Sequence, residues 1–428
     1  MVDRSYQVSY PQRGSVLGES EIAAVARLVH SGNSLSQGWQ RLEFEERFGR
    51  HVGTPHALSV TSGTVALEIA IRLLGLRRGD EVIVTPQTYK ATIQPLLNYD
   101  VTVRFCDVDP RSLNATAETI EPLLTSRTRA VLLVHYGGVP CDMDGITALT
   151  RPRGITVVED CAHAIGSVYK GRRPGALADI GCFSFHSSKN ISTLGEGGMI
   201  TLTEPGLAER VERLRSNEAD AVYEESLQPI GGWTGAQPWM MHPGPSFTHR
   251  CTAVRYGGTN ATLSEAGAVV GSAQLDRLPA LMARRRLIAS RIDEVLARFP
   301  GVSVQAVPPD ATHSYHLYTF FVEPESGIDR DRLIDRLDAL GVQMQLRYFP
   351  LHLLAEWRAR GHGLGECPVA EHSWFHRQVN LPCHPGLTDA QVDRMTDLLE
   401  AALAGERGKS GATAAGRTVA VESAGVSL

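Results

Sequence analysis

One lysine stands in a setting that favours covalent chemistry. Lys189 lies in CFSFHSSKNISTLGEGGMI, between an apolar run typical of a strand and a glycine-rich return. Ser187, Ser188 and Asn190 flank it, which is unusual for a plain surface charge. A lysine amine forms a Schiff base with an aldehyde once it is deprotonated, and partial burial beside another cation favours that state. Taken alone, Lys189 is also consistent with an exposed lysine that has no catalytic role.

A group of polar residues lies at the end of another apolar run. VVEDCAHAIG places Glu159, Asp160 and His163 where a central strand should end. Burying a carboxylate costs free energy unless a cation meets it. An aspartate in this place can hold the protonated ring nitrogen of a pyridine cofactor. The alternative is a helix N-cap or a structural ion pair.

The third feature is a short polar loop before a helix. SVTSGTVAL places Thr61, Ser62, Gly63 and Thr64 between the strand-like HALSV and a helix that begins near Val65. Free amide groups at a helix N-terminus, a hydroxyl and a glycine that permits close approach are suited to binding phosphate. An ordinary N-cap without a ligand is the alternative here.

Together the three features predict pyridoxal 5′-phosphate. This cofactor needs a phosphate site, an acid for its ring nitrogen and an amine for its aldehyde, and no other common cofactor needs all three. GEGG is not a dinucleotide-binding motif, because no G-x-G-x-x-G follows a strand here. There is no Walker A lysine motif either, so the sequence indicates neither a dinucleotide site nor a P-loop. We predict no metal site: His372 and His376 have helical metal spacing but lack a third ligand.

The elements that must position these residues alternate between helices and short β-branched runs. This alternation predicts an α/β fold with a mostly parallel sheet, in which ligands bind at the strand ends. The clearest strands are EVIVTP (81–86), VTVRFCDVDP (101–110), RAVLLVHYGG (129–138) and GITVVEDCAHAIG (154–166). Helices are predicted over 64–76 and 264–299. HSYHLYTFFVEP, a helix over 329–340 and GVQMQLRYFP then form a second α/β pattern.

These patterns divide the chain into an arm (1–15), a large cofactor-binding domain (16–275), a smaller C-terminal α/β domain (276–405) and a disordered tail (406–428). Between 217 and 256 the periodicity is lost, and we expect this insert to act as a substrate lid.

Composition excludes several classes of protein. The 428 residues include 42 Lys and Arg against 47 Asp and Glu, a slightly acidic balance that is unlike a nucleic-acid-binding surface. No apolar run is long enough to cross a membrane and the N-terminus does not resemble a signal peptide, so a cytoplasmic protein is expected. We interpret the seven separated cysteines as small buried residues. Arg284–Arg286 is interpreted as a solvated helix face.

The ordered motifs resemble the DegT/StrS family of sugar and cyclitol aminotransferases, enzymes of the fold-type-I pyridoxal phosphate superfamily. The resemblance runs from about Val16 to Ala404. It rests on SGNSLSQGWQRLEFEERFGRHVG, TSGTVAL, TPQTYKAT, DVDP, EDCAHAIG, SFHSSKNISTLGEGG, GGTNATLSE and PLHLL with LPCHPGL.

The resemblance implies a role for eight residues. Lys189 would be the lysine joined to the cofactor and Asp160 the partner of the ring nitrogen, and both would be catalytic. His163 would contact the ring hydroxyl and Tyr89 would stack on the ring. Gly63, Thr64 and Ser184 would hold the phosphate. Asn260 would come from a second subunit, which implies a homodimer with shared active sites.

The substrate is predicted from departures within the resemblance. Where many members read G-Y-N-Y-R, this chain reads GTNAT, so Ala261 replaces an aromatic residue and Thr262 an arginine. The change and the enlarged insert are closer to the branch that aminates keto-cyclitols such as scyllo-inosose in aminoglycoside antibiotic biosynthesis, with L-glutamine as the amino donor. An aminotransferase of a nucleotide-linked keto-deoxysugar is the alternative. The presence of Lys189 disfavours the family's dehydratase branch. The roughly 15 residues before the first motif disfavour a regulator with a DNA-binding module.

Overall fold

The computed structural model describes residues 6–11, 13–216, 221–223, 251–254 and 258–407. Most of the predicted lid and the predicted tail lie outside these residues, so neither prediction is tested. Of the 217–256 segment, the short strands β9 (Ala221–Tyr223) and β10 (Cys251–Val254) are described, and they pair antiparallel.

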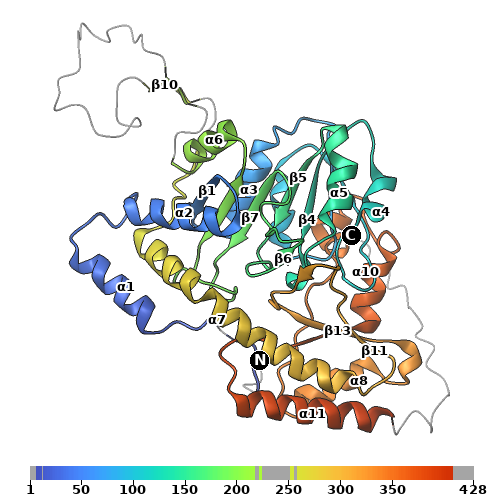
Figure 1. The fold of residues 1–428 in the computed structure, drawn as a ribbon. Helices are drawn as coiled ribbons and strands as arrows, with labels where there is room; N and C mark the ends of the chain where they lie inside the picture. Colours follow the sequence, from blue (N-terminus) through green and yellow to red (C-terminus); the bar gives the residue numbers. More distant parts are fainter. Residues whose placement is uncertain (1–5, 12, 217–220, 224–250, 255–257, 408–428) are drawn as a thin grey trace, which may run out of the picture.

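A seven-stranded sheet forms the centre of the molecule, in the order β1-β8-β7-β5-β4-β2-β3 (Figure 1). β8 runs antiparallel to both of its neighbours, and the other six strands point the same way. The predicted mostly parallel α/β sheet is thus confirmed. Its strands are β1 (His56–Val60), β2 (Glu81–Val84), β3 (Thr102–Phe105), β4 (Thr128–Val134), β5 (Thr156–Asp160), β7 (Ile180–Ser184) and β8 (Gly198–Leu202).

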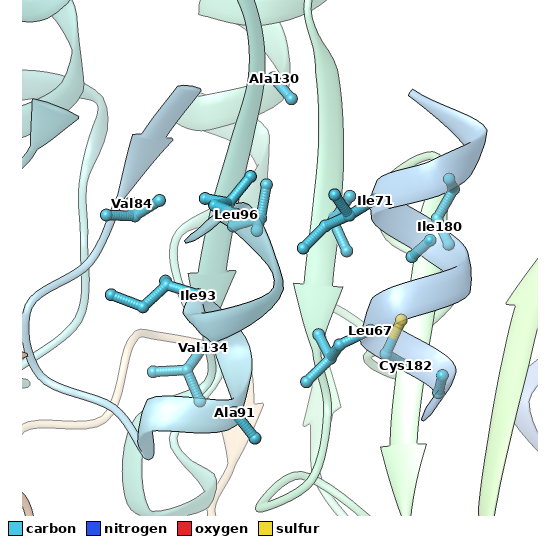
Figure 2. Close-up of a cluster of buried hydrophobic side chains, with 14 of the residues drawn as sticks. Leu67, Ile71, Val84, Ala91, Ile93, Leu96, Ala130, Val134, Ile180 and Cys182 are labelled. Carbon is cyan, nitrogen blue, oxygen red and sulfur yellow. The ribbon is translucent and has the colours of Figure 1, made fainter. Parts of the chain in front are cut away.

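Helix α3 (Gly63–Leu73) covers one face of this sheet, as its Ala, Leu and Ile content predicts. It begins where Ser62 Oγ accepts a hydrogen bond from Val65 N at 3.2 Å, a normal N-cap. Figure 2 shows Leu67 and Ile71 of α3 beside Ile180 and Cys182 of β7. Burying a leucine or isoleucine contributes about 1.5–3 kcal/mol, so this contact fixes α3 on the sheet.

A 32-residue helix, α7 (Glu265–Leu296), connects the central sheet to a second one. It packs at one end against α1 (Glu19–His30) and α2 (Trp39–Val52), and at the other against α11 (Asp389–Arg407) (Figure 1). The predicted helix over 264–299 is confirmed. The predicted domain boundary at 275 falls inside it and remains a prediction.

The second sheet has three antiparallel strands in the order β11-β13-β14. They are β11 (Val302–Val304), β13 (Tyr318–Val322) and β14 (Gln378–Leu381). The end of α7, α8 (Arg330–Ala339) and α11 enclose a core with this sheet that includes Ile292, Leu333 and Leu399. The segment GVQMQLRYFP forms no strand of this sheet, contrary to the second predicted α/β pattern. It pairs only through the single bridge Val8↔Val342 and continues toward the central sheet.

Shorter elements complete the two layers. They are α4 (Ala117–Ile120), α5 (Met143–Thr150), α6 (Pro205–Arg215), α9 (Ala355–Arg358), α10 (Pro368–His372), β6 (Val168–Tyr169), β12 (Ala311–Thr312), the π-helical turn Ser373–Arg377 and the 3₁₀ turns Lys90–Thr92, Gln94–Asn98, Glu121–Leu123, Tyr136–Gly138, Arg151–Arg153, Pro324–Ser326 and Leu351–Leu353.

The six cysteines with described side chains are all buried and free, as predicted, while the side chain of Cys251 lies outside the described part. Among the described residues, no helix combines the length and the apolar character that crossing a membrane requires.

The prediction of a solvated face over Arg284–Arg286 is wrong for its central residue. Arg285 is 1% exposed, because it faces inward from α7 while its neighbour Arg286 is exposed. Its guanidinium donates to the carbonyl oxygens of Tyr315, Cys383 and Gly14, at 2.5–2.7 Å. Arg285 thus joins α7, the second sheet and the N-terminal arm at one point.

Replacing Arg285 should therefore destabilise the fold. Arg285→Met leaves three buried carbonyl groups without their donor, and we expect a loss of about 2–4 kcal/mol of unfolding free energy. Arg286→Met, the exposed neighbour, should change it by less than about 0.5 kcal/mol. Thermal and urea unfolding of both variants measure the difference. Equal effects of the two changes would contradict the role given to Arg285.

Candidate active site

The candidate site lies at one edge of the central sheet. β1, β2, β5 and β7 point the same way, so their carboxyl ends meet there, the position where open α/β sheets bind ligands. A cavity of about 450 Å³ opens at this edge. Seven of the predicted site residues line it: Gly63, Thr64, Tyr89, Asp160, His163, Ser184 and Lys189. The eighth, Asn260, is exposed and is not part of this lining.

Lys189 projects from the loop between β7 and β8. Ser187 N donates to Gly195 O at 2.7 Å, which closes the loop, and Gly195 has a φ of +125° that a side chain would strain. Burial lowers the pKa of Lys189 to about 8, with Arg347 acting in the same direction and Asp160 opposing it. A lysine with such a pKa is neutral in about one tenth of molecules at pH 7, enough to act as a nucleophile.

Asp160 is the last residue of β5 and is 5% exposed. Its Oδ2 lies 2.7 Å from Thr92 Oγ1, and its Oδ1 accepts a hydrogen bond from Ala162 N at 3.0 Å. These contacts fix the carboxylate in one orientation at the wall of the cavity. A buried carboxylate held in this way can pair with a cationic ring nitrogen.

The neighbouring Glu159 points to the other side of the strand, as the alternation of side chains requires. It accepts hydrogen bonds from the amides of Gly175, Leu177 and Ala178 and lies 2.9 Å from His135 Nε2. Among the described residues, Glu159, His135 and Cys161 form the one group of three metal-ligating side chains. The imidazole and carboxylate are already engaged within the protein, so this group serves the fold.

A cradle for an anion forms where β1 runs into α3. The amides of Gly63 and Thr64 precede the first intrahelical hydrogen bond, from Ala66 N to Ser62 O, and so point out of the helix. A Cβ on Gly63 would lie 2.7 Å from Ser184 Cβ. Glycine is therefore required here because it brings the Ser184 hydroxyl close to the helix N-terminus.

His163 lies in a stack of three rings. The ring of His316 stacks on that of His163 with 4.4 Å between the centroids. The ring of Tyr348 is nearly parallel to that of His163, and their centroids are 5.7 Å apart. His163 Nε2 is 3.2 Å from Tyr348 Oη, and its buried Nδ1 has no hydrogen-bond partner among the described residues. Burial, with Lys189 and Arg347 nearby, holds the pKa of His163 well below its usual value, so the ring is neutral.

Sequence reasoning missed Arg347 and Tyr348 in the cavity wall, and Thr92, which donates a hydrogen bond to Asp160. Thr92 follows Tyr89 by one 3₁₀ turn, and no polar pattern marks it. Arg347 and Tyr348 belong to GVQMQLRYFP, whose apolar pattern indicated a strand. Their position just before the motif PLHLL is the signal that could have located them.

These residues fit pyridoxal 5′-phosphate. The cavity offers an amine with a lowered pKa, a fixed buried carboxylate, outward amides at a helix N-terminus and an imidazole nitrogen without a protein partner. Its volume is also in the range of small-molecule and cofactor sites.

Comparison with known proteins gives the same answer. Residues 16–400 match the model of the DegT/DnrJ/EryC1/StrS aminotransferase family. The spore coat polysaccharide biosynthesis protein SpsC of Bacillus subtilis is 32% identical over 389 residues, which cover 90% of this chain and 94% of SpsC. GDP-perosamine synthase of Caulobacter vibrioides is 32% identical over 363 residues, 85% of this chain and 90% of that protein.

Solved structures agree with the sequence relatives. The aminotransferase TlmJ of Streptoalloteichus hindustanus is 33% identical, with a TM-score of 0.79 over 92% of this chain and 99% of TlmJ. The family match extends over the described cavity and both sheets. The chain therefore belongs to the DegT/DnrJ/EryC1/StrS aminotransferase family and is an aminotransferase that depends on pyridoxal 5′-phosphate.

Proposed function

We propose that this aminotransferase moves an amino group from L-glutamine to a keto-cyclitol such as scyllo-inosose, in aminoglycoside antibiotic biosynthesis. The observation that carries the proposal is the GTNAT sequence beside the cofactor cavity. Thr262 pairs with Val60, at the end of β1, and Ala261 O accepts from Thr61 N at 2.9 Å. The short side chains at 261 and 262 thus stand directly before the anion cradle, where many family members carry an aromatic residue and an arginine.

A nucleotide-linked keto-deoxysugar is the second candidate acceptor. It is favoured by the likeness to GDP-perosamine synthase over most of both chains. The two candidates differ in charge, because a diphosphate linkage needs cationic partners whereas a cyclitol needs only hydrogen-bonding groups.

The residues of the cavity divide the work of amino transfer. The bound cofactor supplies an aldehyde and an electron-accepting ring. Asp160 would hold the ring nitrogen protonated, and Thr92 and the Ala162 amide keep Asp160 in place. Lys189 Nζ would bind the cofactor's aldehyde and would move a proton to or from the substrate carbon, a role for which a pKa near 8 is suited. The face of Tyr89 and the phosphate cradle would fix the cofactor's orientation.

We further propose that the enzyme works as a homodimer in which Asn260 reaches the cofactor of the partner subunit. Asn260 is exposed and is held by a bridge to Ser216 at the end of α6, beside its own cavity but outside its lining. A residue so placed is available to a second copy of the chain.

Lys189 should be essential, and its reactivity should depend on pH near 8. Lys189→Gln should lower amino transfer by several orders of magnitude, because the amine is the nucleophile and the proton carrier. In the protein freed of cofactor, covalent capture of added pyridoxal phosphate, trapped by borohydride and located by mass spectrometry, should rise with pH to half its maximum near 8, since only the neutral amine reacts. The exposed Lys90→Gln serves as the control. A midpoint near 10.5, or capture by Lys189→Gln, would contradict this role.

Asp160 should be needed for rate and not for the fold. Asp160→Ala, and the equal-sized Asp160→Asn, should cost about 10³-fold or more in turnover, because the ring loses its charge partner. The near-UV circular dichroism should stay that of the parent protein. Replacement of the exposed Asp144 by alanine should leave turnover unchanged. Turnover close to that of the parent in both Asp160 variants would remove this residue from the mechanism.

The acceptor can be identified from half-reactions followed by absorbance. The pyridoxal-loaded protein is mixed separately with scyllo-inosamine, with GDP-perosamine and with L-glutamine. We expect conversion of the cofactor to its pyridoxamine form by scyllo-inosamine and L-glutamine. Conversion by GDP-perosamine and not by scyllo-inosamine would replace the cyclitol by the nucleotide sugar.

A further inference from the structure

Arg347 brings a second cation into the cavity that holds Lys189. It lines this cavity together with Tyr348, and on its other side it lines a smaller pocket with Tyr10, Ser188 and His316. The side chain is half-buried and near enough to lower the pKa of both Lys189 and His163. Arg347 thus lies beside the amine that reacts with the cofactor.

The charge of Arg347 has no acidic partner in the described part of the chain. Its Nη2 donates to the amide oxygen Gln345 Oε1 at 2.8 Å, and its backbone N donates to Asn380 Oδ1 at 3.0 Å. The nearby Asp160 is held by Thr92 and Ala162, and it would be occupied by the ring nitrogen of the cofactor. Glu196 stands at the rim, 65% exposed and beside His186. A guanidinium with only neutral partners can form an ion pair with the carboxylate of a ligand.

Tyr10 of the N-terminal arm sets the position of this guanidinium. The Arg347 group lies over the Tyr10 ring, 5.3 Å from its centroid. Tyr10 is itself held, because its N donates to Gln343 Oε1 at 2.8 Å. The arm around it is fixed by Gln343 N to Val8 O and by Arg285 to Gly14 O. The fork of Arg347 is therefore ordered before any substrate arrives.

We propose that Arg347, positioned by Tyr10, binds the α-carboxylate of the amino donor. In an α-amino acid, the carboxylate is attached to the same carbon that bears the amine. A cation near Lys189 can therefore hold the carboxylate while the amine replaces the lysine at the cofactor. Neither a cyclitol nor its amino product carries such a group, so Arg347 distinguishes the donor from the acceptor. The inference rests on the proposed use of an amino-acid donor and is independent of which acceptor is aminated.

The test compares the two half-reactions in variants of Arg347. In Arg347→Gln, the L-glutamine concentration that gives half-maximal conversion of the cofactor should rise about 10- to 100-fold, the loss of one charge-assisted pair. Arg347→Lys should recover part of this. Half-saturation with the amine product, and the affinity for pyridoxal phosphate, should change by less than about twofold. Arg360→Gln, an exposed arginine over Trp357, is the matched control.

A donor without the carboxylate provides the second readout. 4-Aminobutanamide is L-glutamine without its α-carboxylate, and the parent enzyme should use it far less well than L-glutamine. Arg347→Gln should remove most of that preference. Tyr10→Leu should weaken L-glutamine binding, whereas Tyr10→Phe, which keeps the ring under the guanidinium, should restore it.

Two results would overturn the inference. One is an equal loss in both half-reactions of Arg347→Gln, and the other is a loss of cofactor affinity, which would assign Arg347 to the cofactor phosphate. A failure of the proposed function looks different: the parent enzyme itself would not react with L-glutamine. The same comparison is then made with L-glutamate or L-alanine, which carry the same carboxylate.

Discussion

The site depends on a buried carboxylate and a half-buried amine that line the same cavity. Asp160 ends β5 in the interior of the sheet, and Lys189 lies in the loop that follows the neighbouring strand β7. Removal from water penalises both charges, so each needs polar support. Thr92 and the Ala162 amide support the acid, while the amine loses part of its proton affinity. Because β8 runs antiparallel to β7, the loop that joins them stays at the carboxyl end of β7. Lys189 therefore lies at the edge where the parallel strands end.

Much of this arrangement follows from the sequence. Polar residues after apolar runs located Asp160, and TSGT before an Ala- and Leu-rich helix located the cradle, because strand ends and helix starts are decided by local chemistry. Arg285 and Arg347 were not located. Arg285 is read as solvated because a run of arginines gives no sign of which helix face turns inward. The role of Arg347 depends on contacts with Tyr10, more than 300 residues away along the chain, and the pattern of GVQMQLRYFP describes only its local preference.

The second sheet acts on the site without contributing a strand to it. The segment that follows α8 leaves the small core at Val342 and delivers Arg347 and Tyr348 to the cavity. The stack of His316, His163 and Tyr348 joins residues from both parts of the molecule. Segments that adjoin the two sheets thus meet at one side of the cavity.

Helix α7 carries a proline in its interior, Pro279, near its middle. Proline has no amide hydrogen, so the carbonyl of Leu275 loses its usual intrahelical donor and the helix is least stiff at that turn. A rod of 32 residues is about 48 Å long. A bend of a few degrees at a soft point near its middle displaces the far end by one or two ångströms. Pro279 therefore marks the turn at which α7, the helix that joins the central sheet to the second sheet, bends most easily.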